Sequence, residues 1–214
     1  MSLRIERIAI FGGSFDPVHN AHVALARLAL DELQLDELRW VPAGQAWQKV
    51  RPLTAAVHRK AMLQLAIAGE PRFSVSRLEL DRAGASFTLD TVREMQAAMH
   101  GAQPGARWFL LIGQDQYAGF HTWQGWQELL ERVTLAVAQR NVPAGAGAQP
   151  WAADAQVQRA AHAVVTLPMM DVSSTDIRQR VADGQGIDAL VPPAVARYIE
   201  QHNLYRRTDL HGHS

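Results

Sequence analysis

Two glycines and two histidines lie together near the N-terminus, in a segment of a kind that binds phosphate. The segment reads GGSFDPVHNAH over residues 12–22 and follows an apolar run. Glycines let the backbone approach a ligand closely and leave N–H groups pointing outward. His19 and His22 are three residues apart, so both can face one point at the start of a helix. Imidazoles beside phosphate donate hydrogen bonds, so these residues predict a phosphate site with two histidine donors.

Other interpretations of this segment stay open. The glycines can form a simple turn, and a single histidine more often caps a helix or fills space than binds a ligand. A zinc site would need a third ligand nearby, and the glutamate of an H-E-x-x-H motif is missing. The sequence also lacks the G-x-G-x-x-G and G-x-x-x-x-G-K-[ST] motifs, which argues against an ordinary NAD-binding dehydrogenase or a P-loop ATPase.

A second candidate phosphate site lies near the C-terminus, in the run VSSTDIR that ends at Arg178. Ser173 and Asp176 have the spacing of a capped helix start. The hydroxyls of Ser173, Ser174 and Thr175, together with the free N–H groups of that start, favour an anion. Arg178 can form two parallel hydrogen bonds with phosphate oxygens. An ordinary capped helix with a surface arginine is the more common role for such a run taken alone.

Two further candidate ligand contacts lie in the middle of the chain. Gly113 and Asp115 belong to the run IGQD after an apolar segment, where the glycine gives room for a nucleotide and the carboxylate can accept a ribose hydroxyl. Trp123, which closes the run FHTW, offers an indole face for a pyridine ring. The alternatives are an acidic residue at a helix start and a tryptophan in the core.

The elements that must position these residues alternate along the chain. We expect strands at 5–11, 38–42, 73–80, 108–112, 133–138 and 164–167, and helices at 21–33, 54–68, 88–100, 126–132, 175–182 and 194–203. Asn20 and Thr54 are the expected N-caps of the first two helices. This order predicts an α/β fold with a Rossmann-like, doubly wound parallel sheet and a small C-terminal helical part. Because such sheets bind ligands at the carboxyl ends of their strands, the loops after the first and fourth strands should form the site.

Length and composition bound the remaining possibilities. The 214 residues predict one domain over 1–206, a mobile tail at 207–214 and a surface loop at 141–154. The 21 basic residues balance 21 acidic ones, which argues against a nucleic-acid or membrane-surface partner. The chain has no cysteine, no signal peptide pattern and no apolar stretch long enough to span a bilayer, so we expect a cytoplasmic protein.

Both phosphate segments resemble motifs of the nucleotidyltransferase superfamily with H-x-G-H signatures. The N-terminal segment has the family's pattern except for Ala21, where the family has glycine. Alanine is a good helix former, so the fold should accept it, and the added methyl group bears only on how closely a ligand packs there. The C-terminal run is similar to the family's I-S-S-T-x-I-R motif, with Val172 in place of isoleucine.

Within that superfamily the chain resembles the nicotinate-nucleotide adenylyltransferases from about Arg7 to Arg206. The resemblance rests on IGQD followed by F-x-x-W, on the run SFT that ends at Thr88, and on the closing LYR. It implies transfer of the adenylyl group from ATP to nicotinate mononucleotide in NAD biosynthesis, with Mg²⁺ carried by ATP. Members often have P-P-H-K where this chain has AWQK, so Trp47 and Gln48 receive no role.

The resemblance also implies a set of site residues. His19, His22 and Arg178 would act in catalysis. ATP would contact Gly12, Gly13, Ser14, Phe15, His19, His22, Gly113, Asp115, Ser173, Ser174, Thr175 and Arg178. Nicotinate mononucleotide would contact Thr88, Trp123 and Lys49, with the carboxylate bound at Thr88 and the ring stacked on Trp123. No resident metal is expected.

Two alternatives remain at this stage. One is a sister enzyme, either a nicotinamide-mononucleotide or a phosphopantetheine adenylyltransferase, and the chain length and the F-x-x-W feature argue against the latter. The other is a nucleotide-binding sensor without catalysis, which should have lost a phosphate-site residue, whereas only Ala21 departs from the pattern. The sequence gives no prediction of the oligomeric state.

Overall fold

The computed structural model describes residues 6–44, 52–99, 105–140 and 153–207. Its six strands form one all-parallel sheet in the order β3-β2-β1-β4-β5-β6. The strands are β1 (Arg7–Gly13), β2 (Glu37–Pro42), β3 (Phe73–Val75), β4 (Arg107–Gly113), β5 (Thr134–Arg140) and β6 (His162–Leu167). The direction of winding reverses between β1 and β4, which confirms the expected doubly wound α/β fold.

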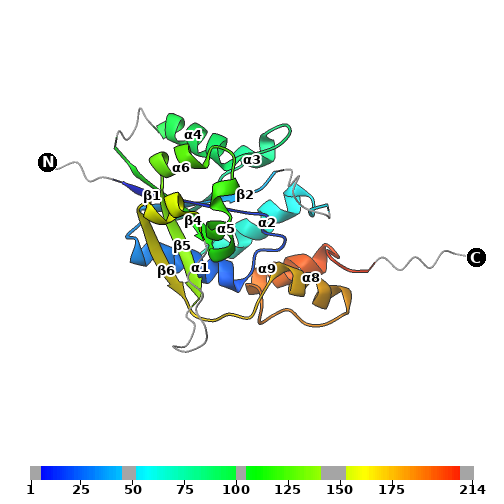
Figure 1. Cartoon of the computed structure of the whole chain (residues 1–214). Helices are drawn as coiled ribbons and strands as arrows, with labels where there is room; N and C mark the ends of the chain where they lie inside the picture. The colour runs from blue at the N-terminus through cyan, green and yellow to red at the C-terminus, as the bar shows by residue number, and fades with distance from the viewer. Residues whose placement is uncertain (1–5, 45–51, 100–104, 141–152, 208–214) are drawn as a thin grey trace, which may run out of the picture.

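Helices cover both faces of the sheet (Figure 1). They are α1 (Asn20–Glu32), α2 (Ala56–Ile67), α3 (Leu78–Asp81), α4 (Thr88–Met99), α5 (Gln114–Ala118), the 3₁₀ helix η1 (Phe120–Thr122), α6 (Trp126–Arg132), α7 (Ala155–Arg159), α8 (Ser174–Ala182) and α9 (Pro193–Gln201). One core contains buried residues of α1, α2, α8 and α9, and the other contains residues of α4, α5, α6 and α7. Because both faces are covered, the central strands are apolar almost throughout, as in Ile8, Ala9 and Ile10 of β1.

The expected strand over 73–80 is wrong in its second half. Pairing with β2 ends at Val75, and the N–H of Ser76 makes a final hydrogen bond of 2.8 Å to the carbonyl of Trp40. The chain then turns into α3, where Arg77 and Asp81 form an ion pair of 2.7 Å one helical turn apart. β3 is an edge strand with a single neighbour, so little holds the later residues in the sheet, whatever their alternation.

Both expected N-caps are wrong because tertiary contacts engage the residues. α1 begins one residue earlier than expected, with His19 at the N-cap, and the Asn20 amide instead donates to the carbonyl of Ala189 at 2.9 Å. α2 has Ala55 at its N-cap, and the backbone N–H of Thr54 donates to the carboxylate of Asp16 at 3.2 Å. In both cases a distant partner replaces local capping.

Most of the expected loop at 141–154 and tail at 207–214 lies outside the described residues. Asp154 is described and caps α7, since its carboxylate accepts a hydrogen bond of 2.8 Å from the N–H of Gln156. In the described part of the chain, no helix combines the length and the hydropathy of a membrane span.

Candidate active site

A cavity of about 990 Å³ opens at the carboxyl ends of β1 and β4, where the winding reverses. The loops after these strands line it, as expected, together with the starts of α4 and α8. The predicted site residues that line it are Gly12, Gly13, Ser14, Phe15, His19, His22, Thr88, Gly113, Asp115, Trp123, Ser173 and Ser174. Thr175 and Arg178 are not among the lining residues, and Lys49 lies outside the described residues.

The two histidines form a stacked pair at the start of α1. Their ring centroids are 3.6 Å apart and their planes differ by 24°. The backbone N–H of His19 donates to Nδ1 of His22 at 3.3 Å. Because Nδ1 accepts this hydrogen bond, a neutral His22 carries its proton on Nε2 and can donate it to a ligand.

Phe11, Phe15 and Trp40 form an aromatic wall behind the pair, and burial against it lowers the pKa values of the histidines. The ring of Phe15 meets the ring of His22 edge-on at 5.2 Å, and Phe11 and Trp40 pack against Phe15. Burial lowers the pKa of His19 to about 4. Burial, and next the charge of a protonated His19, hold the pKa of His22 well below 6.5. Both imidazoles are therefore neutral donors in the free protein, and a bound phosphate would raise both pKa values.

These pKa shifts predict that the protein loses stability in mild acid. Between the ordinary histidine pKa of 6.5 and the folded value of about 4 for His19, the unfolded chain binds more protons than the folded chain. The free energy of unfolding therefore has its full value above pH 6.5 and decreases as the pH falls from 6.5 toward about 4. Urea unfolding at a series of pH values should show the decline, and it should be smaller for His19→Gln, whose side chain does not titrate. A His19 imidazole that titrates near 6.5 in an NMR experiment on the free protein would refute this prediction.

Gly12 and Gly13, the last two residues of β1, have different surroundings. A Cβ at Gly13 would lie 2.9 Å from the ring of Phe15, so the aromatic wall requires glycine there. A Cβ at Gly12 would meet no protein atom within 4 Å, so the backbone at that position borders open space in the cavity. Phe15 itself has a φ of 47° and is 1% exposed, and its ring contacts that of His22.

The start of α8 lies against this loop. Ser173 is the N-cap, and its hydroxyl accepts a hydrogen bond of 3.0 Å from the N–H of Asp176, as the spacing predicted. The hydroxyl of Ser174 donates to the carbonyl of Pro17 at 2.9 Å, across 157 residues of sequence. The segment before α1 and the start of α8, which come from opposite ends of the chain, thus share one cavity, and such an arrangement suits a ligand with several phosphates.

Arg178 has partners within the protein. Its Nη1 donates to the backbone carbonyl of Asp16 at 2.7 Å, and its Nη2 donates to the hydroxyl of Thr175 at 3.0 Å. In this structure the guanidinium fastens the loop after β1 to α8 instead of facing the cavity. The sequence motif carried no sign of this internal partner.

The opposite end of the cavity is formed by Thr88 at the start of α4 and by Trp123 after η1. The indole of Trp123 packs on Phe120 with ring centroids 5.1 Å apart. Asp115, in the first turn of α5, is exposed at the cavity. This end therefore offers a hydroxyl at a helix start, an aromatic face and a carboxylate.

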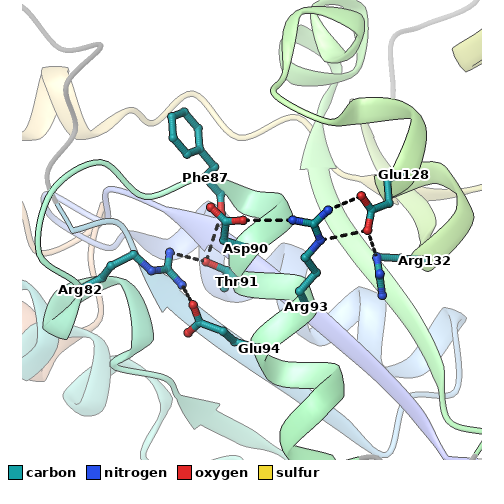
Figure 2. A network of polar contacts seen from close by, with 8 residues as sticks. All are labelled: Arg82, Phe87, Asp90, Thr91, Arg93, Glu94, Glu128 and Arg132. Atoms are coloured by element: carbon teal, nitrogen blue, oxygen red, sulfur yellow. Dashed lines mark hydrogen bonds and ion pairs between the residues drawn. The ribbon is translucent and has the colours of Figure 1, made fainter.

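Polar contacts on two sides hold the start of α4 in place (Figure 2). On one side Arg82 donates to the hydroxyl of the buried Thr91 at 3.1 Å and pairs with Glu94 at 2.7 Å. On the other side Arg93 pairs with Glu128, which also accepts a hydrogen bond from Arg132 (Figure 2). These contacts connect the first turns of the helix that presents Thr88 to the end of α3 and to α6.

Sequence reasoning missed Glu79 and Thr91, which also line the cavity. The hydroxyl of Thr91 donates to the carboxyl of Glu79 at 2.9 Å, and burial raises the pKa of Glu79. Glu79 lies in the segment that was expected to continue a strand, so its position could not be anticipated. Among the described residues, no group of three or more His, Cys, Asp or Glu is placed to hold a metal ion.

Comparison with known proteins agrees with this geometry. Residues 10–180 match the cytidylyltransferase-like family. A probable nicotinate-nucleotide adenylyltransferase of Methylibium petroleiphilum is 48% identical over 206 residues, which cover 94% of this chain and 92% of the relative. One from Bordetella petrii is 45% identical over 208 residues, which cover 94% of this chain and all of the relative.

Solved structures show the same fold. Plasmodium falciparum nicotinic acid mononucleotide adenylyltransferase, complexed with NaAD, superposes with a TM-score of 0.69 at 20% identity, over 94% of this chain and 97% of the other. A putative nicotinate-nucleotide adenylyltransferase from Vibrio parahaemolyticus superposes with a TM-score of 0.66 at 20% identity, over 95% and 98% of the two chains.

Proposed function

We propose that this chain transfers the adenylyl group of ATP to nicotinate mononucleotide. It belongs to the cytidylyltransferase-like family and, within it, to the nicotinate-nucleotide adenylyltransferases. The products are nicotinate adenine dinucleotide and pyrophosphate, and the reaction belongs to NAD biosynthesis. The observation that carries the proposal is the single cavity, with two phosphate-type helix starts at one end and Thr88 and Trp123 at the other. Its volume of about 990 Å³ gives room for a ligand of this size.

The reaction is an in-line displacement at phosphorus. An oxygen of the 5′-phosphate of nicotinate mononucleotide forms a bond to the α-phosphorus of ATP. The bond from that phosphorus to the bridging oxygen of the β-phosphate breaks, and pyrophosphate leaves with the electron pair. A phosphate monoester is already ionised at neutral pH, so no general base is needed. The protein contributes positioning and stabilisation of negative charge.

The residues divide this work between them. His22 donates a hydrogen bond from its Nε2–H to the reacting phosphates. His19, whose ring stacks on that of His22, lies beside the same phosphates. The N–H groups at the start of α8 and the hydroxyl of Ser173 bind the outer phosphates, and the hydroxyl of Ser174 joins them when ATP replaces the carbonyl of Pro17 as its partner. Arg178 holds the loop after β1 in the free protein, and its contact with the outer phosphates during catalysis stays a proposal. Asp115 accepts hydrogen bonds from a ribose.

Mg²⁺ enters with ATP as part of the substrate. Mg²⁺ favours phosphate oxygens and water as ligands, so we expect these rather than protein side chains to hold it. Lys49, which lies outside the described residues, stays a proposed contact of the nicotinate nucleotide. We further propose that residues 1–206 act as one domain and that the reaction takes place in the cytoplasm.

The pyridine end should favour the acid over the amide. The hydroxyl of Thr88 and the N–H groups at the start of α4 are donors, and donors suit a carboxylate better than a carboxamide. A hydrogen bond to a charged group contributes about 1.5–3 kcal/mol, so we expect kcat/KM for nicotinate mononucleotide to exceed that for its amide by about 10-fold or more. Pyrophosphate release with ATP held constant measures the ratio.

The variant Thr88→Val supplies the control, because it keeps the size of the side chain and removes only the donor. It should lower kcat/KM for the acid by about 10-fold and change that for the amide far less. Turnover of phosphopantetheine but not of nicotinate mononucleotide would overturn the proposed function. ATP binding without pyrophosphate release from any of these substrates would point to a nucleotide sensor.

A further inference from the structure

Asp16, in the loop after β1, has a completely buried carboxylate with partners from two distant segments. The hydroxyl of Tyr205 donates to its Oδ1 at 2.7 Å, and the N–H of Thr54 donates to its Oδ2 at 3.2 Å. A buried carboxylate depends strongly on such donors, because no water replaces one that is removed. The side chain of Asp16 therefore links the loop to the segment before α2 and to the segment after α9.

The backbone of the same loop is held by two arginines. Arg178 of α8 donates to the carbonyl of Asp16 at 2.7 Å. Arg59 of α2, which is 2% exposed, donates to the carbonyl of Ser14 at 3.0 Å and to that of Thr54 at 2.9 Å. Helix α2, helix α8 and the segment after α9 thus all contact residues 14–16, which lie shortly before the histidines of the active site.

Tyr205 lies after α9 and takes no part in the cavity. Its φ is 65°, in the left-handed region that non-glycine residues rarely adopt, so the surrounding contacts must hold it there. Its ring packs against the core shared by α1, α2, α8 and α9. Burial, followed by the charge of Asp16, raises its pKa, so its hydroxyl remains a donor over the whole working pH range.

We propose that Tyr205 is a positioning residue for the reaction, acting through Asp16 on the loop that presents the glycine N–H groups and the histidine pair. The expected change in kcat rests on the proposed function, whereas the expected change in ATP affinity can be measured independently of it. Without the hydroxyl, Oδ1 of Asp16 loses the hydrogen bond of 2.7 Å from Tyr205. The loop then settles into other arrangements, and the phosphate-binding groups are no longer held in register.

The test compares Tyr205→Phe with Tyr198→Phe. Tyr198 of α9 is a matched control, because its hydroxyl also makes one cross-helix hydrogen bond, 3.0 Å from Nδ1 of His58, but touches no residue of the loop. We expect Tyr205→Phe to lower kcat by about 10-fold and to weaken ATP binding in calorimetry, with KM for nicotinate mononucleotide changed by less than about twofold. Tyr198→Phe should leave kcat and ATP affinity within about twofold of the unmodified protein.

A double-mutant cycle identifies the route of the effect. If Tyr205 acts through Asp16, Asp16→Asn alone should give the same pattern of lower kcat and weaker ATP binding. The double variant should then lose little more than either single variant. Asp16→Asn leaves Tyr205 in place, so it still decides the question if Tyr205→Phe does not fold.

Three results would overturn the inference. Tyr205→Phe with normal kcat and ATP affinity would reduce Tyr205 to a structural residue, even if its melting temperature falls. Equal losses in Tyr198→Phe, or additive losses in the double variant, would exclude a specific link to the loop. Inactivity of the unmodified protein on nicotinate mononucleotide would instead refute the proposed function, and the calorimetric comparison would still test the role of Tyr205.

Discussion

His22→Ala should lower kcat by about 10²–10³-fold, the usual effect of removing one preorganised donor from the site where charge develops. The ring of His22 is fixed by its contact with Phe15 and by the hydrogen bond from the N–H of His19 to its Nδ1. Its Nε2 proton is therefore aimed before any substrate binds. The change should act mainly on kcat, because the donor stabilises the reacting phosphates more than the bound substrates.

His162→Ala is the matched control for this variant. His162 is an exposed residue of β6 and does not line the cavity, so its removal should change kcat by no more than about twofold. Circular dichroism and thermal melting should show that His22→Ala keeps the fold, because a small side chain at a helix start is tolerated. Turnover of the folded His22→Ala protein close to that of the unmodified protein would refute the role given to this histidine.

Arg59→Met should have the largest effect on stability, a loss of about 3–5 kcal/mol in the free energy of unfolding. The guanidinium is 2% exposed and donates to two backbone carbonyls, and the buried carboxylate of Asp16 lies close enough to interact with its charge. Methionine fills a similar volume, so little stability is lost through packing. The stability is lost because the two carbonyls lose their donor and the carboxylate of Asp16 loses a nearby positive charge. Urea unfolding at neutral pH measures it.

Arg77→Ala separates this effect from the removal of an arbitrary arginine. The side chain of Arg77 is 59% exposed and pairs with Asp81 on the surface of α3. Exposed pairs of this kind contribute about 0–1 kcal/mol, so the variant should unfold almost as the unmodified protein does. Similar small losses for both variants would show that the buried arginine does not hold the loop.

The sequence was sufficient to predict the sheet and the position of the cavity. Runs of apolar residues marked the strands, and the glycine pair that ends the first strand marked the turn toward α1. The rule that parallel sheets bind ligands where their winding reverses then placed the cavity at the loops after β1 and β4. These features depend on local pattern and topology, which a single sequence carries.

Features that depend on distant partners could not be predicted in this way. Asn20 and Thr54 have the side chains of helix caps, but contacts elsewhere in the fold claim both residues. The short helices α3, α5 and α7 were missed, because four or five residues give too little periodicity. The partner of Arg178 was equally invisible, since Asp16 is 162 residues away.

One missed residue did carry a signal. Arg59 lies on the same face of α2 as Met62, Leu63 and Ile67, a spacing that places it in the core. A charged residue at a core position of a helix is uncommon and requires buried partners. This spacing indicates that the guanidinium has buried partners, but it does not identify them as the carbonyls of Ser14 and Thr54. The roles of the predicted site residues in substrate binding stay predictions for the experiments above.

The most direct test of the shared phosphate site is the structure of this protein with a non-hydrolysable ATP analogue and nicotinate mononucleotide. We expect a single triphosphate lying between Nε2 of His22 and the start of α8 at Ser173 and Ser174, with the pyridine ring against Trp123. Phosphates bound at only one of these two segments, or outside their common cavity, would contradict the proposed chemistry.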